Sequence, residues 1–497
     1  MLEKQFCHRI FILILSLIML LSCFSGCSFG TDTMAKPQPA VHTPEGTEVT
    51  LHILTEVSRA SGMMSDLIEE LVEKYSESHE NVTFEIEFLP ESYEERNIRL
   101  EQLRIEIMAG KGPDVYLIPT TNYTGEALFN NLELSMRNGI FHEISAYYNA
   151  DNDLHKEELN EVIMDAGTYG KARYILPLRY DFPVIMVDQE KLQSYGLTVD
   201  DISTTDKMLD TILKSQDSVL ANSAYIETID FDYFFPQLVD YENREVLVTD
   251  VEVADFIRQF QAWRYLYSDD TWSADAILTG PTIMTEYQGF GTYWTMGDYL
   301  FNIEKLSTAL QSKVVAESLG EEIDVYPLYS ADGSLIAHIE YWCAVGSNCE
   351  YPDIAYEFLR EFLTRETQWE LNRDSFLISL SSSFYEDGIP VRSKGAILPL
   401  MESVRNQVAV SPSQSDEDKE RAMLLRSITL EESDIPIWDA EIDQVRFVSY
   451  LDNKLYDKLN NILHDSIYGG KEELSNAEID EMAKEFVTEL RYLMAEG

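Results

Sequence analysis

Hydrophobic and polar residues along the first part of the chain follow two periods in turn. Residues 49–54 alternate apolar and polar side chains, which predicts a β-strand. Over 64–75 the hydrophobic residues recur at helical spacing between charged ones, which predicts a helix with one buried face. The succession repeats as a strand over 82–88, a helix over about 93–109 and a short buried strand over 114–119. This order predicts parallel strands joined by right-handed crossovers, and hence an α/β sheet with helices on both faces.

An apolar run near the N-terminus follows neither period. Residues 10–21 are almost all hydrophobic, with basic residues before them and small residues after them, as in a secretory signal. The run is too short for a membrane-spanning helix, and no later segment approaches the roughly 20 apolar residues that such a helix needs. Phe24-Ser25-Gly26-Cys27 resembles the lipobox of bacterial lipoproteins, in which the cysteine is lipidated and becomes the first mature residue. We therefore expect a signal peptide over residues 1–27 that ends at a lipidated Cys27. Cys23 is a second candidate, and cleavage that releases a soluble protein is the alternative.

The stretch that follows the signal has the composition of a linker. Residues 28–47 contain several prolines and scattered polar residues but no apolar period. Such a segment cannot bury a core, so we expect a flexible tether that holds the folded part away from the membrane.

Length and charge narrow the class of protein. The chain has 497 residues, of which 45% are hydrophobic, enough for a large core and for two lobes rather than one. The formal net charge is −51, and removing the signal residues before Cys27 leaves −52 on the mature chain. An anion of this size is repelled by phosphate backbones and by anionic lipid head groups, which argues against nucleic-acid binding.

Cysteine, histidine and glycine patterns give no support to a catalytic or metal centre. After the signal only Cys343 and Cys349 remain, without metal-ligand spacing, and we expect two unpaired thiols. The eight histidines are scattered, and Asp151-Asn152-Asp153 lacks the glycine of a calcium loop. The sequence contains no nucleophile elbow, zincin motif, phosphate loop or Rossmann glycine run. We therefore expect no metal, no cofactor and no enzymatic activity, although the many carboxylates leave a glycosidase pair numerically possible.

Several segments in order along the chain resemble the extracellular solute-binding proteins of bacterial ABC importers, and most of all the group that binds maltose-type and other sugars. No single segment is diagnostic, but the ordered series is. The resemblance covers most of residues 48–375, and the C-terminal third departs from the family pattern. The segments are 66–75, 82–89, 109–115, 165–170, 174–178, 187–192, 342–347 and 352–359.

The resemblance implies a two-lobed α/β fold of the type II periplasmic-binding-protein kind, each lobe a mainly parallel sheet flanked by helices, with extra C-terminal helices. By that pattern lobe one holds residues 48–179 with 335–375, and lobe two holds 180–334 with 376–497. The resemblance places a ligand in the cleft between the lobes. Open parallel sheets bind ligands where the carboxyl ends of their strands meet, so the loops at those ends are the candidates for contact.

Carbohydrate binding requires flat rings for the apolar faces of a pyranose and planar polar groups for its rim of hydroxyls. Trp294 is the leading aromatic candidate, because it lies in a glycine-flanked turn that resembles a ligand segment of the family. Because side chains alternate along a strand, only one of Tyr341 and Trp342 can face a cleft. The same alternation places Arg179 and Asp181 on one face of their strand. A structural salt bridge is the competing interpretation for this second pair. Core packing or a solvated turn competes with a ligand role at the other positions. The full set of expected ligand contacts is Glu56, Ser58, Arg59, Tyr123, Arg179, Asp181, Tyr293, Trp294, Tyr341 and Trp342.

The expected function is that of a monomeric lipoprotein on the extracellular face of the bacterial cell membrane. It captures a small solute, a mono- or oligosaccharide, and presents it unchanged to the membrane subunits of an ABC importer. Two alternatives remain: the same architecture binding a peptide, polyamine or other small solute, and a surface hydrolase that reuses the fold.

Overall fold

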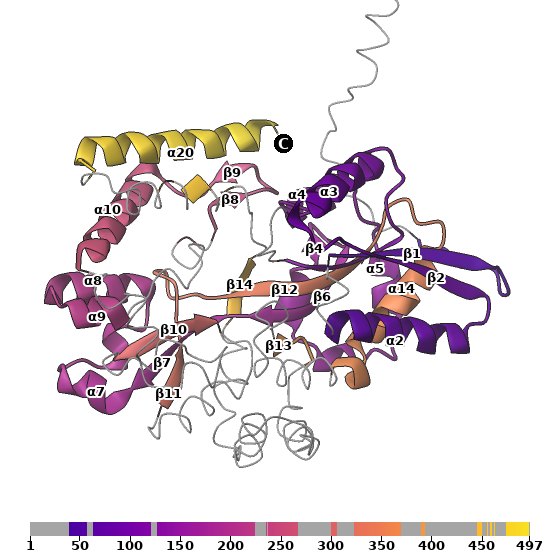
Figure 1. Ribbon diagram of the computed structural model, residues 1–497, viewed down its shortest axis with the longest axis horizontal. Helices are drawn as coiled ribbons and strands as arrows, with labels where there is room; N and C mark the ends of the chain where they lie inside the picture. The colour runs from indigo at the N-terminus through magenta and orange to yellow at the C-terminus, as the bar shows by residue number, and fades with distance from the viewer. Residues whose placement is uncertain are drawn as a thin grey trace, which may run out of the picture. The chain divides into compact units, whose positions relative to one another are not determined.

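The structure is a computed structural model (Figure 1) that describes residues 39–56, 63–120, 127–223, 235, 237–266, 300–305, 323–368, 389–392, 445–449, 455, 458, 459, 462 and 474–496. The expected signal peptide, Cys27 included, lies outside these residues. No helix among them is long and apolar enough to cross a membrane.

The largest sheet contains seven strands and is mixed. Its order is β13-β6-β12-β3-β1-β2, with β14 beside β12. β1 pairs in parallel with both β2 and β3, as the sequence pattern predicts, whereas β12 runs antiparallel to β3 and β6. The strands are β1 (Val49–Thr55), β2 (Val82–Phe88), β3 (Val115–Pro119), β6 (Ile175–Asp181), β12 (Leu335–Val345), β13 (Ile389–Pro390) and β14 (Val445–Ser449).

Helices that accompany this sheet include the two that the hydrophobic spacing predicts. Those two predictions are confirmed by α2 and α3, and Gly110 ends α3 with a φ of 69°, in the left-handed region that glycine adopts at little cost. The helices are α2 (Met63–Ser78), α3 (Tyr93–Met108), α4 (Leu132–Arg137), α5 (Ser145–Ala150), α6 (Glu161–Asp165) and α14 (Pro352–Arg360).

A second, three-stranded sheet has the order β10-β7-β11 and is antiparallel throughout its described strands. The expectation of a mainly parallel sheet in each lobe is wrong for these strands. The physical reason is connectivity: β7 (Pro183–Asp188) continues β6 after one residue, and β11 (Ile323–Pro327) leads into β12. Because β12 is antiparallel to β6, β11 meets β7 in the opposite direction. β10 (Phe301–Lys305) pairs with the other side of β7.

The described part of the chain also contains two two-stranded sheets and five further α-helices. They are β4 (Thr168–Tyr169) with β5 (Ala172–Arg173), β8 (Val239–Asp240) with β9 (Glu245–Val246), and the helices α7 (Gln189–Ser194), α8 (Thr205–Ser215), α9 (Ser218–Ser223), α10 (Asp250–Leu266) and α20 (Asn476–Glu496).

Buried hydrophobic residues form two clusters. The first surrounds the large sheet and its helices, and the second joins β7 and β10 to α8, α10 and α20. α20 packs against α10 in the second cluster. β13 and β14, which fall in the range expected for lobe two, pair with strands of the large sheet. The bounds of the lobes stay predictions.

The described end of the expected tether is docked on the protein. The Val41 amide donates to the Tyr147 hydroxyl at 3.0 Å, and the Thr43 amide and hydroxyl donate to the two carboxylate oxygens of Asp353 at 2.5 and 2.6 Å. Composition alone predicts that this stretch stays clear of the folded part. The bonds to α5 and α14 instead tie Val41 and Thr43 to these two helices.

The two cysteines outside the signal are both free and buried, so the expectation of unpaired thiols is confirmed. Burial raises the pKa of the Cys343 thiol well above its ordinary value. Burial, with a smaller contribution from Asp114, raises the pKa of the Cys349 thiol to about 12.

Candidate functional site

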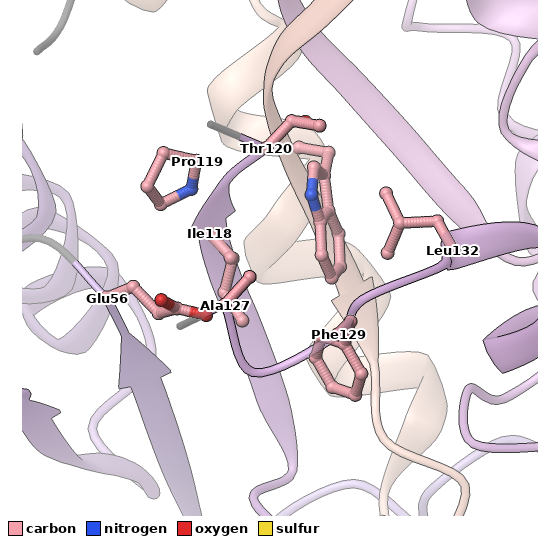
Figure 2. A pocket seen from close by; sticks show the side chains of 8 residues that line it. Glu56, Ile118, Pro119, Thr120, Ala127, Phe129 and Leu132 are labelled. Atoms are coloured by element: carbon pink, nitrogen blue, oxygen red, sulfur yellow. The ribbon is translucent and has the colours of Figure 1, made fainter. Parts of the chain in front are cut away.

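The carboxyl ends of β1 and β3 meet at one edge of the large sheet. The two strands are parallel, with Thr55 opposite Leu117, so the residues that follow them, Glu56 and Thr120, come together. A pocket lies at this edge, with about 250 Å³ of empty volume that includes open solvent at its mouth. Figure 2 shows its lining side chains: Glu56, Ile118, Pro119, Thr120, Ala127, Phe129, Leu132 and Trp342. This is the position at which an open parallel sheet is expected to bind a ligand.

Glu56, a predicted ligand contact, is held by the protein itself. Its side chain is 1% exposed, and its Oε2 accepts a hydrogen bond from Arg96 Nη2 at 2.5 Å. Its other carboxylate oxygen accepts from the Leu128 amide at 3.0 Å. Burial lowers the pKa of the Arg96 guanidinium, while the charge of Glu56 acts to raise it. The carboxylate therefore fixes α3 and the segment at Leu128 to the end of β1, whatever else it contacts.

Tyr341 and Trp342 alternate on β12, and the structure assigns them different surroundings. The Tyr341 hydroxyl donates to the Leu117 carbonyl at 3.2 Å and lies 3.3 Å from the Thr55 hydroxyl. Trp342 lies opposite Ile118 of β3 and lines the pocket beside it. Its ring contacts Phe129 and Phe141 at centroid distances of 5.8 and 5.5 Å. Of the two, Trp342 is the one at the pocket.

Two polar atoms of the pocket lining are buried without a hydrogen-bond partner in the described part of the chain. They are Trp342 Nε1 and Thr120 Oγ1. The backbone around them is satisfied, since the Thr120 amide donates to the Glu340 carbonyl of β12 at 2.9 Å. The two side chains thus come from neighbouring strands whose pairing fixes their separation.

Arg179 and Asp181 of β6 lie deep in the large sheet. They are 1% and 3% exposed, and every residue of β6 is buried. Asp181 stands opposite His338 of β12, with 3.6 Å between Oδ1 and Nδ1, a distance for an ion pair when the imidazole is protonated. Pro183, where β7 begins, is only two residues beyond Asp181, so this pair lies at the passage from the large sheet to the three-stranded one.

The remaining predicted contacts lie outside the described residues. They are Ser58, Arg59, Tyr123, Tyr293 and Trp294. Among the described residues no group of acidic, histidine or cysteine side chains could hold a metal ion. Asp151, at the loop that resembles the start of a calcium site, instead accepts hydrogen bonds from two backbone amides and from the Tyr356 hydroxyl, and it forms an ion pair with Arg360 at 2.9 Å.

Sequence reasoning missed three contributors to this pocket and its support. Thr120 is the first residue after β3, and its position within a strand-end loop was the available signal. Arg96 stands on the buried stripe of α3, four residues before Leu100, where a charged residue requires a buried partner. Phe129 comes from the segment before α4, and no local pattern indicates its position.

Similarity to known proteins identifies the family of this chain. The chain matches the family of bacterial extracellular solute-binding proteins over residues 62–369, more than half of its length. The chain belongs to this family. No curated protein matches it.

Solved structures with the fold of this solute-binding protein are distant in sequence. The galacto-N-biose-/lacto-N-biose I-binding protein of an ABC transporter from Bifidobacterium longum is 14% identical, with a TM-score of 0.51 over 91% of this chain and 99% of that one. A periplasmic oligogalacturonide-binding protein from Yersinia enterocolitica is 12% identical, with a TM-score of 0.52 over 90% and 99%. Both show that this chain has the α/β fold of type II periplasmic binding proteins.

A third similar structure carries a different function. It is a de novo designed cysteine esterase, 13% identical, with a TM-score of 0.52 over 90% of this chain and 99% of that one. Likeness at this identity concerns the fold alone, and a fold does not decide function. Family membership is therefore the finding that identifies this chain as a solute-binding protein.

Proposed function

We propose that the protein captures a mono- or oligosaccharide in a cleft between two lobes and delivers it to the membrane subunits of an ABC importer. Membership in the extracellular solute-binding family is the observation that carries this proposal. Support for a sugar comes from the similar structures, two of which are named as binders of saccharides or oligogalacturonides. The apolar lining that Phe129 and Trp342 give the pocket suits the carbon atoms beside a sugar hydroxyl.

Binding without chemistry is supported by the lining of the pocket. The described residues that line it include no histidine, cysteine or serine, and the one carboxylate among them is held by Arg96 and the Leu128 amide. A general acid or base must reach a reacting atom with a proton to exchange. Glu56 instead serves as a buried structural anion, which suits a protein that releases its ligand unaltered.

The proposed mechanism is closure about the strands that connect the two sheets. The chain passes between them at β6 to β7 and again at β11 to β12. Each passage is short, so a change of a few backbone torsions there moves one sheet and its helices against the other. Ligand contacts made from both sides would shift the population toward the closed form, which the importer would then recognise.

We further propose that Cys27 carries the lipid that holds the protein on the extracellular face of the membrane, as a monomer. The support is the signal-like run before it and the extracellular character of the family. Cys27→Ser is expected to release the protein into the medium and to abolish labelling by an alkyne fatty acid, whereas Cys23→Ser should change neither. Retention of label in Cys27→Ser would refute the assignment.

A ligand panel tests the proposed function. The full chain is purified in a detergent without a sugar head group, and its melting is followed with neutral mono- and oligosaccharides, spermidine and trialanine. A ligand at 100 times its dissociation constant stabilises the fold by about 2.7 kcal/mol. We expect a saccharide to raise the melting temperature. If only spermidine or trialanine raises the melting temperature, the ligand is a polyamine or a peptide and not a sugar.

A further inference from the structure

The pocket at the ends of β1 and β3 contains two polar atoms that the described protein does not satisfy. Trp342 is 1% exposed and Thr120 is 8% exposed, and neither the indole Nε1 nor the hydroxyl has a partner within the described residues. A buried polar group without a partner costs about 1 to 3 kcal/mol. Two such groups in one pocket indicate that something else supplies their hydrogen bonds.

The charge of the pocket is already neutralised. Glu56 is the one ionisable side chain among the 8 that line it. Both of its oxygens accept hydrogen bonds from within the protein, one of them from the cationic Arg96. Among the described lining residues, a cationic ligand would meet a carboxylate that is already paired, and an anionic one would meet no cation. The pocket therefore favours a neutral group.

The remaining lining residues determine the size and character of that group. Ile118, Pro119, Ala127, Phe129 and Leu132 line the rest of the pocket with carbon (Figure 2). Apart from its mouth, which opens to solvent, the pocket has room for about one water-sized group. An alcohol oxygen fits this space, can accept from the indole N–H and can exchange a hydrogen bond with the threonine hydroxyl.

We propose that this pocket is a subsite for a single hydroxyl group of a neutral, polyhydroxylated solute. Trp342 Nε1 donates to the hydroxyl oxygen, Thr120 Oγ1 completes its hydrogen bonding, and the carbon that bears the hydroxyl packs against the apolar wall. The inference rests on the proposed function and deepens it, because it selects neutral saccharides over polyamines, peptides with charged termini and phosphorylated sugars.

Two substitutions remove the polar atoms while keeping the shape. Trp342→Phe removes the indole N–H and retains an aromatic ring against Phe129, and Thr120→Val replaces the hydroxyl with a methyl group of similar size. Trp263→Phe is the matched control for the first: its Nε1 donates to the Ala221 carbonyl at 3.0 Å in the second hydrophobic cluster. Thr83→Val on β2 is the control for the second.

The measurement is isothermal titration of the full chain with D-glucose, D-galactose, D-mannose, maltose, lactose, mannotriose and spermidine, followed by single-deoxy analogues of the sugar that binds. We expect Trp342→Phe and Thr120→Val each to weaken the binding of that sugar about tenfold, because each variant loses one buried hydrogen bond. One deoxy analogue should bind the native chain about tenfold more weakly than the parent sugar does. The same analogue should bind each of the two variants no more weakly than the parent sugar does. The control variants should bind as the native chain does.

The outcomes separate the two proposals. If a saccharide binds and both variants keep its affinity within twofold, the pocket holds only a water molecule, and the subsite is refuted while the proposed function stands. If spermidine binds and no saccharide does, the proposed function and the subsite are both refuted. Both are also refuted if no member of the panel binds. A variant that melts at the same temperature as the native chain is correctly folded. If Trp342→Phe melts at a lower temperature, the affinity of Thr120→Val, the smaller change, decides whether the subsite exists.

Discussion

At the scale of single residues, Glu56 shows how far a strand-end position predicts a role. Its place directly after β1 gives the expectation of a ligand contact, and the structure does put it in the lining of a pocket. Its partner Arg96 lies 40 positions further along the chain, on α3. A long-range pairing of this kind has no local sequence signal. The position of Glu56 was therefore predictable, and its neutralisation by Arg96 was not.

Removal of Arg96 should cost far more stability than removal of an exposed cation. Arg96→Met leaves the Glu56 carboxylate buried without its cationic partner, and breaking a buried pair by removing one partner costs about 3 to 5 kcal/mol. Lys214→Met, which breaks an exposed pair with Asp210 on α8, should cost less than about 0.5 kcal/mol. Urea unfolding measures both, and equal losses would contradict the buried pairing.

The Cys349 thiol should be nearly inert in the folded protein. With a pKa raised to about 12, it is ionised at pH 8 about 10³-fold less than an ordinary thiol of pKa about 8.5. Because folding raises this pKa, the thiol's contribution to stability is complete below pH about 8.5 and is lost as the pH rises toward 12.

Reaction with a thiol reagent at pH 8 checks this. The rate in buffer should be about 10³-fold below the rate in urea, since only the thiolate reacts. The Cys343→Ser/Cys349→Ser double variant gives the background from the other cysteines. Equal rates in buffer and in urea would show that Cys349 is not buried as the structure has it.

At the scale of elements, the sequence predicted what is local and missed what is distant. The order β1, α2, β2, α3, β3 follows from two hydrophobic periods, and the parallel pairing of β1 with β2 and β3 follows from that order. β13 and β14 join the large sheet from positions far along the chain. The antiparallel second sheet depends on the direction in which β12 returns, which no local pattern contains.

The docking of the N-terminal segment on α14 is an element-scale contact with a direct test. Asp353→Ala removes both acceptors for Thr43, and hydrogen bonds to a charged group contribute about 1.5 to 3 kcal/mol. Hydrogen exchange at the Thr43 amide should therefore become at least about tenfold faster.

The matched control is Asp66→Ala, which removes an acidic residue from the first turn of α2 and leaves Thr43 untouched. Mass spectrometry of peptides that cover residues 39–47 measures the exchange. An unchanged rate in Asp353→Ala would mean that the segment is not held by this carboxylate.

At the scale of the whole molecule, three features underlie the proposed function. A signal-like run ends at Cys27, a mixed sheet presents a pocket where β1 and β3 end, and the chain passes twice between two sheets. The first was readable from composition, and the pocket's place from the rule for parallel strands. The proposed hydroxyl subsite depends on how β3 and β12 bring Thr120 and Trp342 together, which required the structure.

Equilibrium dialysis of the full chain against the saccharide panel, followed by mass analysis of the recovered sugar, distinguishes binding from chemistry in one experiment. We expect one neutral saccharide to be retained on the protein side and to be recovered with its mass unchanged. Retention of spermidine or trialanine in place of any saccharide, or recovery of a cleaved sugar, would contradict the proposed function.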